Sequence, residues 1–270
     1  SEELKGVQLF DALDKMDYYN EATLLKKNTG IKKQQLSNLK AHLYKQILTS
    51  LRLIDDENNI DIHLHEQMDY ARILYNKGLY LQSLKVLDKI KEQAKKRNQL
   101  TYLQQVLFFE KNIESLYITR SMQDRAEQLS KEADAVNERL VLVSQLSNLS
   151  LQLYSWYIKN GHCRNEKEAA MVQDFFNSKL TFKIADCKGF YEKLFLYQSY
   201  CWNAFIRQDF LQYYRYTQKW VDLFDDQPQM IAIETAHYIK GMHNLMGAHF
   251  DLTNHQKLKE TLEKFEKFCN

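Results

Sequence analysis

Residues Asp69–Arg97 read DYARILYNKGLYLQSLKVLDKIKEQAKKR and carry the clearest structural pattern in the chain. Apolar residues recur at helical spacing on both sides of Lys77-Gly78, at Ala71, Leu74, Tyr75, Leu84, Leu87, Ile90 and Ala94. Gly78 fits the end of a helix, where glycine adopts a left-handed conformation at little cost. The outer face of the second helix is mostly lysine, at Lys85, Lys89, Lys91 and Lys95. One such hairpin cannot bury its apolar face alone, so the pattern predicts further helical hairpins beside it.

The composition favours an all-α protein. The 270 residues include 7 glycines and 1 proline. Average usage of about 7% and 5% would give roughly 30 of these residues together. Such scarcity excludes long turn-rich stretches and disfavours a sheet protein with many tight hairpins. No Ser/Gly/Pro-rich linker interrupts the chain, which predicts one continuous body.

Charge and hydropathy exclude several classes of protein. The 37 basic and 35 acidic residues nearly cancel, which gives no global drive toward nucleic acid or an anionic membrane. The longest apolar runs fall far short of the roughly 20 residues that span a bilayer, so no membrane segment is expected. The four cysteines, Cys163, Cys187, Cys201 and Cys269, are widely spaced without a CxxC pair. This spacing favours a reduced, cytoplasmic protein over a disulfide framework.

The chain order predicts an N-terminal helical cap at residues 1–56, followed by five irregular hairpins at 57–270 and continuous with them. The cap contains three predicted helices, at about Glu3–Lys15, Asn20–Lys27 and Lys33–Ile54. Turns within the later hairpins are predicted near Gly78, Arg120, Gly161, Gln208 and Asp251. Breaks between hairpins are predicted near Glu57, Asn98, Asn137, Lys188 and Gln227-Pro228. These positions predict twelve or thirteen helices, the last at about Asn254–Phe268, in a right-handed solenoid.

Two glycines lie inside the apolar pattern that follows Pro228. Gly241 and Gly247 each cost a helix interior roughly 1 kcal/mol relative to alanine. We expect the compensation to be the close approach of a neighbouring helix.

The hairpin at Asp69–Arg97 resembles the tetratricopeptide repeat. Five positions fit that motif: Ala71 and Ser83 as small residues, Gly78 and Tyr80 at the turn, and Leu87 as the later bulky residue. A weaker match covers Leu194–Gln227. The sequence LFDAL at Leu9–Leu13, together with GLY at Gly78–Tyr80, resembles a family of uncharacterised tetratricopeptide-like proteins from Bacteroidetes. The resemblance implies a right-handed α-α superhelix in which the first helix of each pair lines the concave face.

The residues that could carry chemistry do not form an enzyme-like or metal-binding pattern. Zinc pairs on a helix need histidines three or four apart, whereas His237, His243, His249 and His255 recur every six residues. The chain has no GxSxG motif, no glycine-rich phosphate loop and no CxxC. We therefore expect no enzyme activity, no metal and no cofactor.

Aromatic density points instead to a protein partner. Between Phe190 and Phe224, 13 of 35 residues are Phe, Tyr or Trp, and core packing accounts for most of them. The tyrosines among them are too many to face inward together, so we expect some to form an amphipathic wall for a protein or extended peptide. On the concave face, the first helices of the two matched hairpins would present the candidate partner-binding residues Met68, Arg72, Tyr75, Gln198 and Trp202.

One alternative remains open on the sequence. The chain could be a regulator that senses a peptide or binds nucleic acid together with a further domain. Two basic clusters, Lys26-Lys27 with Lys32-Lys33 and Lys95-Lys96-Arg97, suggest this reading. Cations at a helix C-terminus also complement the helix dipole, which explains such clusters without nucleic acid. We therefore disfavour nucleic acid as a partner.

Overall fold

The chain is all-helical in a computed structural model that describes residues 2–27, 30–55, 59–116, 124–182 and 184–269. The described residues form thirteen α-helices and no β-strand, which confirms the predicted class. The chain divides into two compact units, Ser1–His65 and Glu66–Asn270. The division lies within a helix, downstream of the boundary predicted at residue 56.

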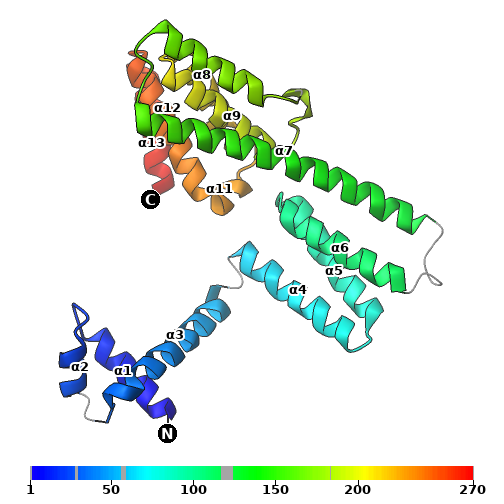
Figure 1. Cartoon of the computed structure of the whole chain (residues 1–270), viewed down its shortest axis with the longest axis vertical. Coiled ribbons are helices and arrows are strands. Elements are labelled where there is room, and N and C mark those ends of the chain that lie inside the picture. Colours follow the sequence, from blue (N-terminus) through cyan, green and yellow to red (C-terminus); the bar gives the residue numbers. More distant parts are fainter. Residues whose placement is uncertain (1, 28–29, 56–58, 117–123, 183, 270) are drawn as a thin grey trace. The chain divides into compact units, whose positions relative to one another are not determined.

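The first unit contains three helices at the predicted places: α1 (Glu2–Asp14), α2 (Glu21–Lys27) and α3 (Lys33–Asp55) (Figure 1). Leucines from all three helices form a small core, made of Leu9, Leu24, Leu36, Leu39 and Leu43 together with Ile31. The apolar side of α3 is buried only in the first half of the helix. Leu36, Leu39 and Leu43 are buried there, whereas Ile47, Leu51 and Ile54 in the second half are exposed.

The division falls within α4 (Ile60–Asn76), and the second unit contains the rest of that helix and nine further α-helices. These are α5 (Tyr80–Lys96), α6 (Leu100–Leu116), α7 (Arg125–Asn160), α8 (Glu166–Lys179), α9 (Phe190–Ile206), α10 (Phe210–Asp226), α11 (Gln229–Ile233), α12 (Thr235–Asp251) and α13 (His255–Cys269). Helices close in sequence pack together, in the pairs α5–α6, α6–α7, α7–α9, α9–α10, α10–α12 and α12–α13.

Most of the predicted helix ends are confirmed. Gly78 separates α4 from α5 with φ 75°, and Gly161 ends α7 with the same φ. Breaks also occur at Asn98, Lys188, Gln208, Gln227-Pro228 and directly after Asp251. The turn predicted at Arg120 and the break predicted at Glu57 lie outside the described residues.

The break predicted near Asn137 is wrong. Figure 1 shows α7 as one uninterrupted helix, and it runs for 36 residues through that position. A single asparagine costs a helix less than about 1 kcal/mol, and neither glycine nor proline occurs between Arg125 and Asn160 to stop the helix. The second and third predicted hairpins therefore share α7.

The small residues of the opening hairpin bring α4 and α5 together. Ala71 and Ser83 are fully buried, and the Ser83 hydroxyl donates a hydrogen bond of 2.8 Å to the Ala71 carbonyl oxygen. A larger side chain at either position would separate the two helices.

Lys91 contradicts the prediction that the lysines of α5 lie on its outer face. It is 7% exposed and pairs with Glu110 of α6, whose carboxylate is fully buried. Arg125 of α7 lies 3.3 Å from the same carboxylate. Glu132 of α7 lies 3.4 Å from Lys91 and 2.5 Å from Lys95. Burial raises the pKa of Glu110 despite these cations, because it penalises the charged carboxylate more than Lys91 and Arg125 favour it.

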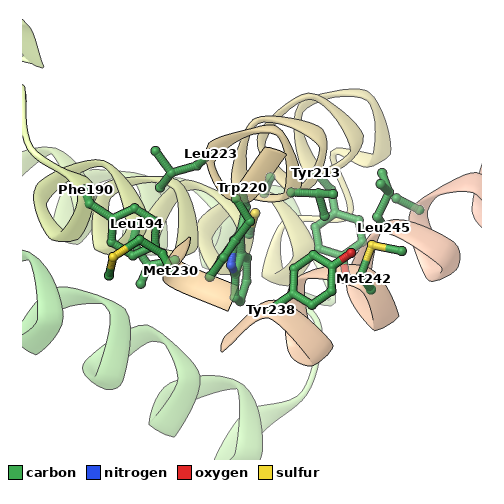
Figure 2. Close-up of a cluster of buried hydrophobic side chains, with 14 residues drawn as sticks. Phe190, Leu194, Tyr213, Trp220, Leu223, Met230, Tyr238, Met242 and Leu245 are labelled. Carbon is green, nitrogen blue, oxygen red and sulfur yellow. The ribbon is translucent and has the colours of Figure 1, made fainter. Parts of the chain in front are cut away.

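A hydrophobic core of the unit lies among α9, α10, α11 and α12. Figure 2 shows Trp220 in the middle of this cluster, between Leu194 and Met230 on one side and Tyr238 on the other. Trp220 is fully buried. A Cβ atom at Gly241 of α12 would lie 3.1 Å from its indole nitrogen, so the predicted close approach is confirmed there. At Gly247 the prediction is wrong, since a Cβ would meet no described atom of another element within 4 Å.

These two glycines give a matched pair of substitutions in one helix. Gly247→Ala is expected to raise the free energy of unfolding by about 0.5–1 kcal/mol, because alanine favours a helix interior and nothing obstructs its methyl group. Gly241→Ala gains the same helix propensity, but its methyl group would press against the buried indole of Trp220. We therefore expect it to lower the free energy of unfolding by about 1–3 kcal/mol. Urea unfolding followed by circular dichroism measures both, and equal effects would contradict the close packing at Gly241.

His249 of α12 gives the core a dependence on pH. It is 1% exposed beside the Tyr214 ring, with ring centroids 5.2 Å apart. Burial lowers its pKa below the usual 6.5, and Lys257 lowers it further while Glu260 opposes the change. Below pH 6.5 the unfolded chain therefore takes up a proton that the folded chain still refuses, and stability is lost as the pH falls.

We expect unfolding experiments at pH 7 and pH 5 to show this loss. His249→Gln removes the titration, so the wild-type chain should lose more stability than the variant between the two pH values. The exposed His243, replaced by glutamine in a parallel variant, serves as the control. Identical losses in the wild-type chain and His249→Gln would show that His249 is not held in its neutral form.

Candidate functional site

A hollow of about 350 Å³ lies between α4 and α6 within the second unit. Four residues of α4 and four of α6 line it: Met68, Arg72, Tyr75, Asn76, Gln105, Phe108, Phe109 and Asn112. The Tyr75 ring meets Phe109 edge-on at 5.3 Å and Tyr80 at 5.4 Å, which fixes it at the wall. This α4–α6 hollow thus has an ordered aromatic side and several side-chain amides.

Three of the five predicted site residues therefore lie together. Met68 is 3% exposed, so its predicted exposure is wrong and it belongs to the floor of the hollow, whereas Tyr75 is half-buried and Arg72 exposed. The Arg72 guanidinium lies 3.9 Å from Asp69, one turn away on the same exposed face of α4. An exposed pair of this kind contributes less than about 1 kcal/mol, so Arg72 is free to exchange Asp69 for another anion.

A second hollow, of about 240 Å³, adjoins the first on the other side of α6. Residues of α6 and α7 line it: Gln104, Gln105, Leu107, Phe108, Lys111, Ala133 and Asn137. Gln104 donates a hydrogen bond of 3.3 Å to Asn137 across the two helices. Gln105 and Phe108 border both hollows, so the two hollows adjoin at these side chains. We refer to the two hollows together as the α6 groove.

Phe108 is the most unusual side chain of the α6 groove. It is 67% exposed, although its neighbours Leu107 and Phe109 face the protein. A single exposed apolar side chain is ordinary on a protein surface, so what distinguishes Phe108 is its position at the border of two hollows. Phe108 is not among the site residues predicted from the sequence. Its helical position could have indicated this exposure. The buried residues of α6, among them Leu103, Val106 and Ile113, lie on one face of the helix, and Phe108 lies outside that face.

A third hollow, of about 790 Å³, continues along α7. It shares Asn137 with the α6 groove and extends over Val141 and Leu142 to Phe182 and Lys188. Arg139, on its border, donates a hydrogen bond of 2.6 Å to the buried Glu192 of α9. This arginine therefore ties α7 to α9 and is not available to a ligand.

Gln198 and Trp202 do not belong to the groove, and their predicted exposure is wrong. They are 5% and 8% exposed. Gln198 lies 2.9 Å from the His237 ring and accepts a hydrogen bond of 3.3 Å from Ser150. Lys240 lies 4.5 Å from the centre of the Tyr154 ring and 5.1 Å from that of Trp202. Both predicted site residues thus join α7, α9 and α12 and do not face a partner.

The predicted aromatic wall is also wrong. None of the thirteen aromatic residues between Phe190 and Phe224 is exposed. Tyr200 and Tyr216 stack on each other at 4.1 Å with their rings 6° apart, and burial raises the pKa of Tyr200 to about 12. Helix α9 packs against both α7 and α10, and α10 against both α9 and α12, so each helix has covered surfaces on several sides. A helix that is covered on several sides can bury more aromatic side chains than a helix with a single buried face.

The remaining candidates behave as packing or surface residues. All four cysteines are free thiols. His162 contacts the Phe205 carbonyl oxygen at 2.8 Å. Among the described residues, no three His, Cys, Asp or Glu side chains gather as a metal site. Of the basic clusters, Lys95 is held by Glu132.

Comparison of the chain with protein-family models, curated proteins and solved structures finds no match. Within the described ranges, no helix has the length and apolar character needed to cross a membrane.

Proposed function

We propose that this chain is a non-catalytic helical-repeat scaffold that binds a protein through an extended peptide segment in the α6 groove. The observation that carries the proposal is the exposed Phe108 between two hollows whose polar lining is mostly amide. We further propose that the hairpins wind as a right-handed, tetratricopeptide-like superhelix with this groove on its concave side. The four free cysteines fit action in the reducing cytoplasm.

The groove suits an extended backbone better than a helix. Five amide side chains line it, Asn76, Gln104, Gln105, Asn112 and Asn137. Each amide offers both a donor and an acceptor, as does every residue of an unpaired peptide chain. A helical ligand has already satisfied its backbone groups internally. Neighbouring helix axes lie about 8–10 Å apart, so a path from α4 across α6 to α7 accommodates about five or six extended residues.

Selection from a phage library of random dodecapeptides tests the proposal. The full chain is the bait, and each selected peptide is measured again on Phe108→Ser. We expect peptides whose affinity falls at least tenfold on this variant, because it removes an apolar anchor of the groove. Leu211→Ser is the matched control, since Leu211 is 72% exposed on α10, away from the groove.

One outcome of the phage selection would contradict the proposal. Phe108 is largely exposed, so its replacement should leave the circular dichroism spectrum and melting temperature unchanged. If no selected peptide distinguishes Phe108→Ser from Leu211→Ser, the α6 groove is not a peptide-binding site.

A further inference from the structure

We infer that the segment bound in the α6 groove carries aspartate or glutamate side chains on both sides of one large apolar residue. The inference rests on the proposed function and adds the chemistry of the ligand to it. It depends on where the charged side chains lie relative to Phe108.

Only two charged residues line the groove, and both are cations. Arg72 belongs to the α4–α6 hollow and Lys111 to the α6–α7 hollow. No carboxylate lines either hollow in the described part of the chain. Lys111 has no carboxylate of the described residues within ion-pair distance, and Arg72 has only the weak, exposed contact with Asp69. An anionic ligand would therefore complement the groove at two points.

The two cations belong to different hollows, which meet at the apolar anchor Phe108. Phe108 borders both hollows, with Arg72 in one and Lys111 in the other. A segment that crosses α6 with a large apolar side chain against Phe108 places its flanking residues beside these cations. A chain has a single C-terminal carboxylate, which cannot serve both positions. In a segment that lies within a longer partner chain, both anions are therefore acidic side chains.

The acidic residues of the ligand are expected only on the part of its path that crosses α4 and α6. Beyond Asn137 the border of the α7 hollow carries three carboxylates, Asp134, Glu138 and Asp186. Its cations are Lys188 and Arg139, and Arg139 is paired with Glu192. Acidic residues that extended past α7 would meet these carboxylates, so we place the carboxylates of the ligand on the α4 and α6 part of its path. This limit makes the preferred sequence short.

A single-stranded nucleic acid is the competing anionic ligand, since cations beside an exposed aromatic also suit it. The amide lining favours a peptide. Phosphate and sugar oxygens offer few donors to the amide oxygens, whereas each peptide N–H supplies one. Two cations also neutralise few phosphates.

Fluorescence polarisation with labelled synthetic probes tests the inference on the full chain. Three dodecamer pools share a central phenylalanine or leucine, flanked by Glu and Asp, by Lys and Arg, or by Gln and Ser. A labelled oligo(dT) probe is the fourth. We expect the acidic pool to bind about tenfold more tightly than the neutral pool, with an advantage that shrinks as salt rises. Arg72→Gln combined with Lys111→Gln should abolish this advantage, so that the acidic and neutral pools bind the variant with similar affinity.

The outcomes separate the two proposals. Equal or tighter binding of the neutral or basic pool, lost on Phe108→Ser, overturns the inference about charge and leaves the peptide groove standing. Tighter binding of oligo(dT) than of every pool overturns the inference in favour of nucleic acid. No binding of any peptide pool overturns the proposed function as well. Lys159→Gln with Lys167→Gln, on α7 and α8 outside the groove, is the charge-matched control.

Discussion

Trp220→Ala is expected to lower the free energy of unfolding by about 3–5 kcal/mol. The indole is fully buried, and it fills the space among α9, α10, α11 and α12. Its removal leaves a cavity among residues of four helices, and the loss of buried contacts adds to the cost of that cavity. Urea unfolding followed by circular dichroism measures the change.

Leu211→Ala is the control for this prediction. Leu211 lies on the same helix and is 72% exposed, so its truncation should change the free energy by less than about 0.5 kcal/mol. If Trp220→Ala costs no more than Leu211→Ala, the packing of α10 against α12 is not as described.

The second large effect is expected at the buried ion pair of α5 and α6. Glu110→Ala leaves Lys91 buried without its closest partner, and it removes the contact that Arg125 makes with α6. Removing one partner of a buried ion pair costs about 3–5 kcal/mol. Glu132, 3.4 Å from Lys91, offsets part of this cost, so we expect the lower end of that range. Thermal unfolding of the variant should show a correspondingly lower melting temperature.

A double variant distinguishes the charge effect from lost packing. Glu110→Met with Lys91→Met replaces both charges by apolar side chains of similar length, and we expect it to recover most of the stability. A double variant as unstable as Glu110→Ala would show that the pair contributes through its shape rather than through its charges.

The sequence predicts where most helices begin and end, because the residues that stop helices are local signals. Gly78, Gly161 and Gln227-Pro228 act within a few residues, and the structure has helix ends at each. Asn137 was a weaker signal, and favourable neighbours on both sides overrode it. Burial depends on partners far away in the chain. Nothing near Lys91 in the sequence indicates that Glu110 and Glu132 surround it.

The candidate site was predicted in part for the same reason. Arg72 and Tyr75 share one face of α4 with Met68, and helical spacing alone places them together. The opposite wall comes from α6, and only its packing phase could have identified Phe108. Gln198 and Trp202 failed as candidates because α9 is covered by both α7 and α10, which the spacing of its residues does not reveal.

Photo-crosslinking tests the central claim most directly. A dodecapeptide pool with benzoylphenylalanine at the anchor position and random flanks is irradiated with the full chain, and the modified residues are identified by mass spectrometry. We predict cross-links within residues 68–76 of α4 and 104–112 of α6, and their loss on Phe108→Ser. Cross-links confined to α9–α13, unchanged by that substitution, would contradict the assignment of the α6 groove as the peptide-binding site.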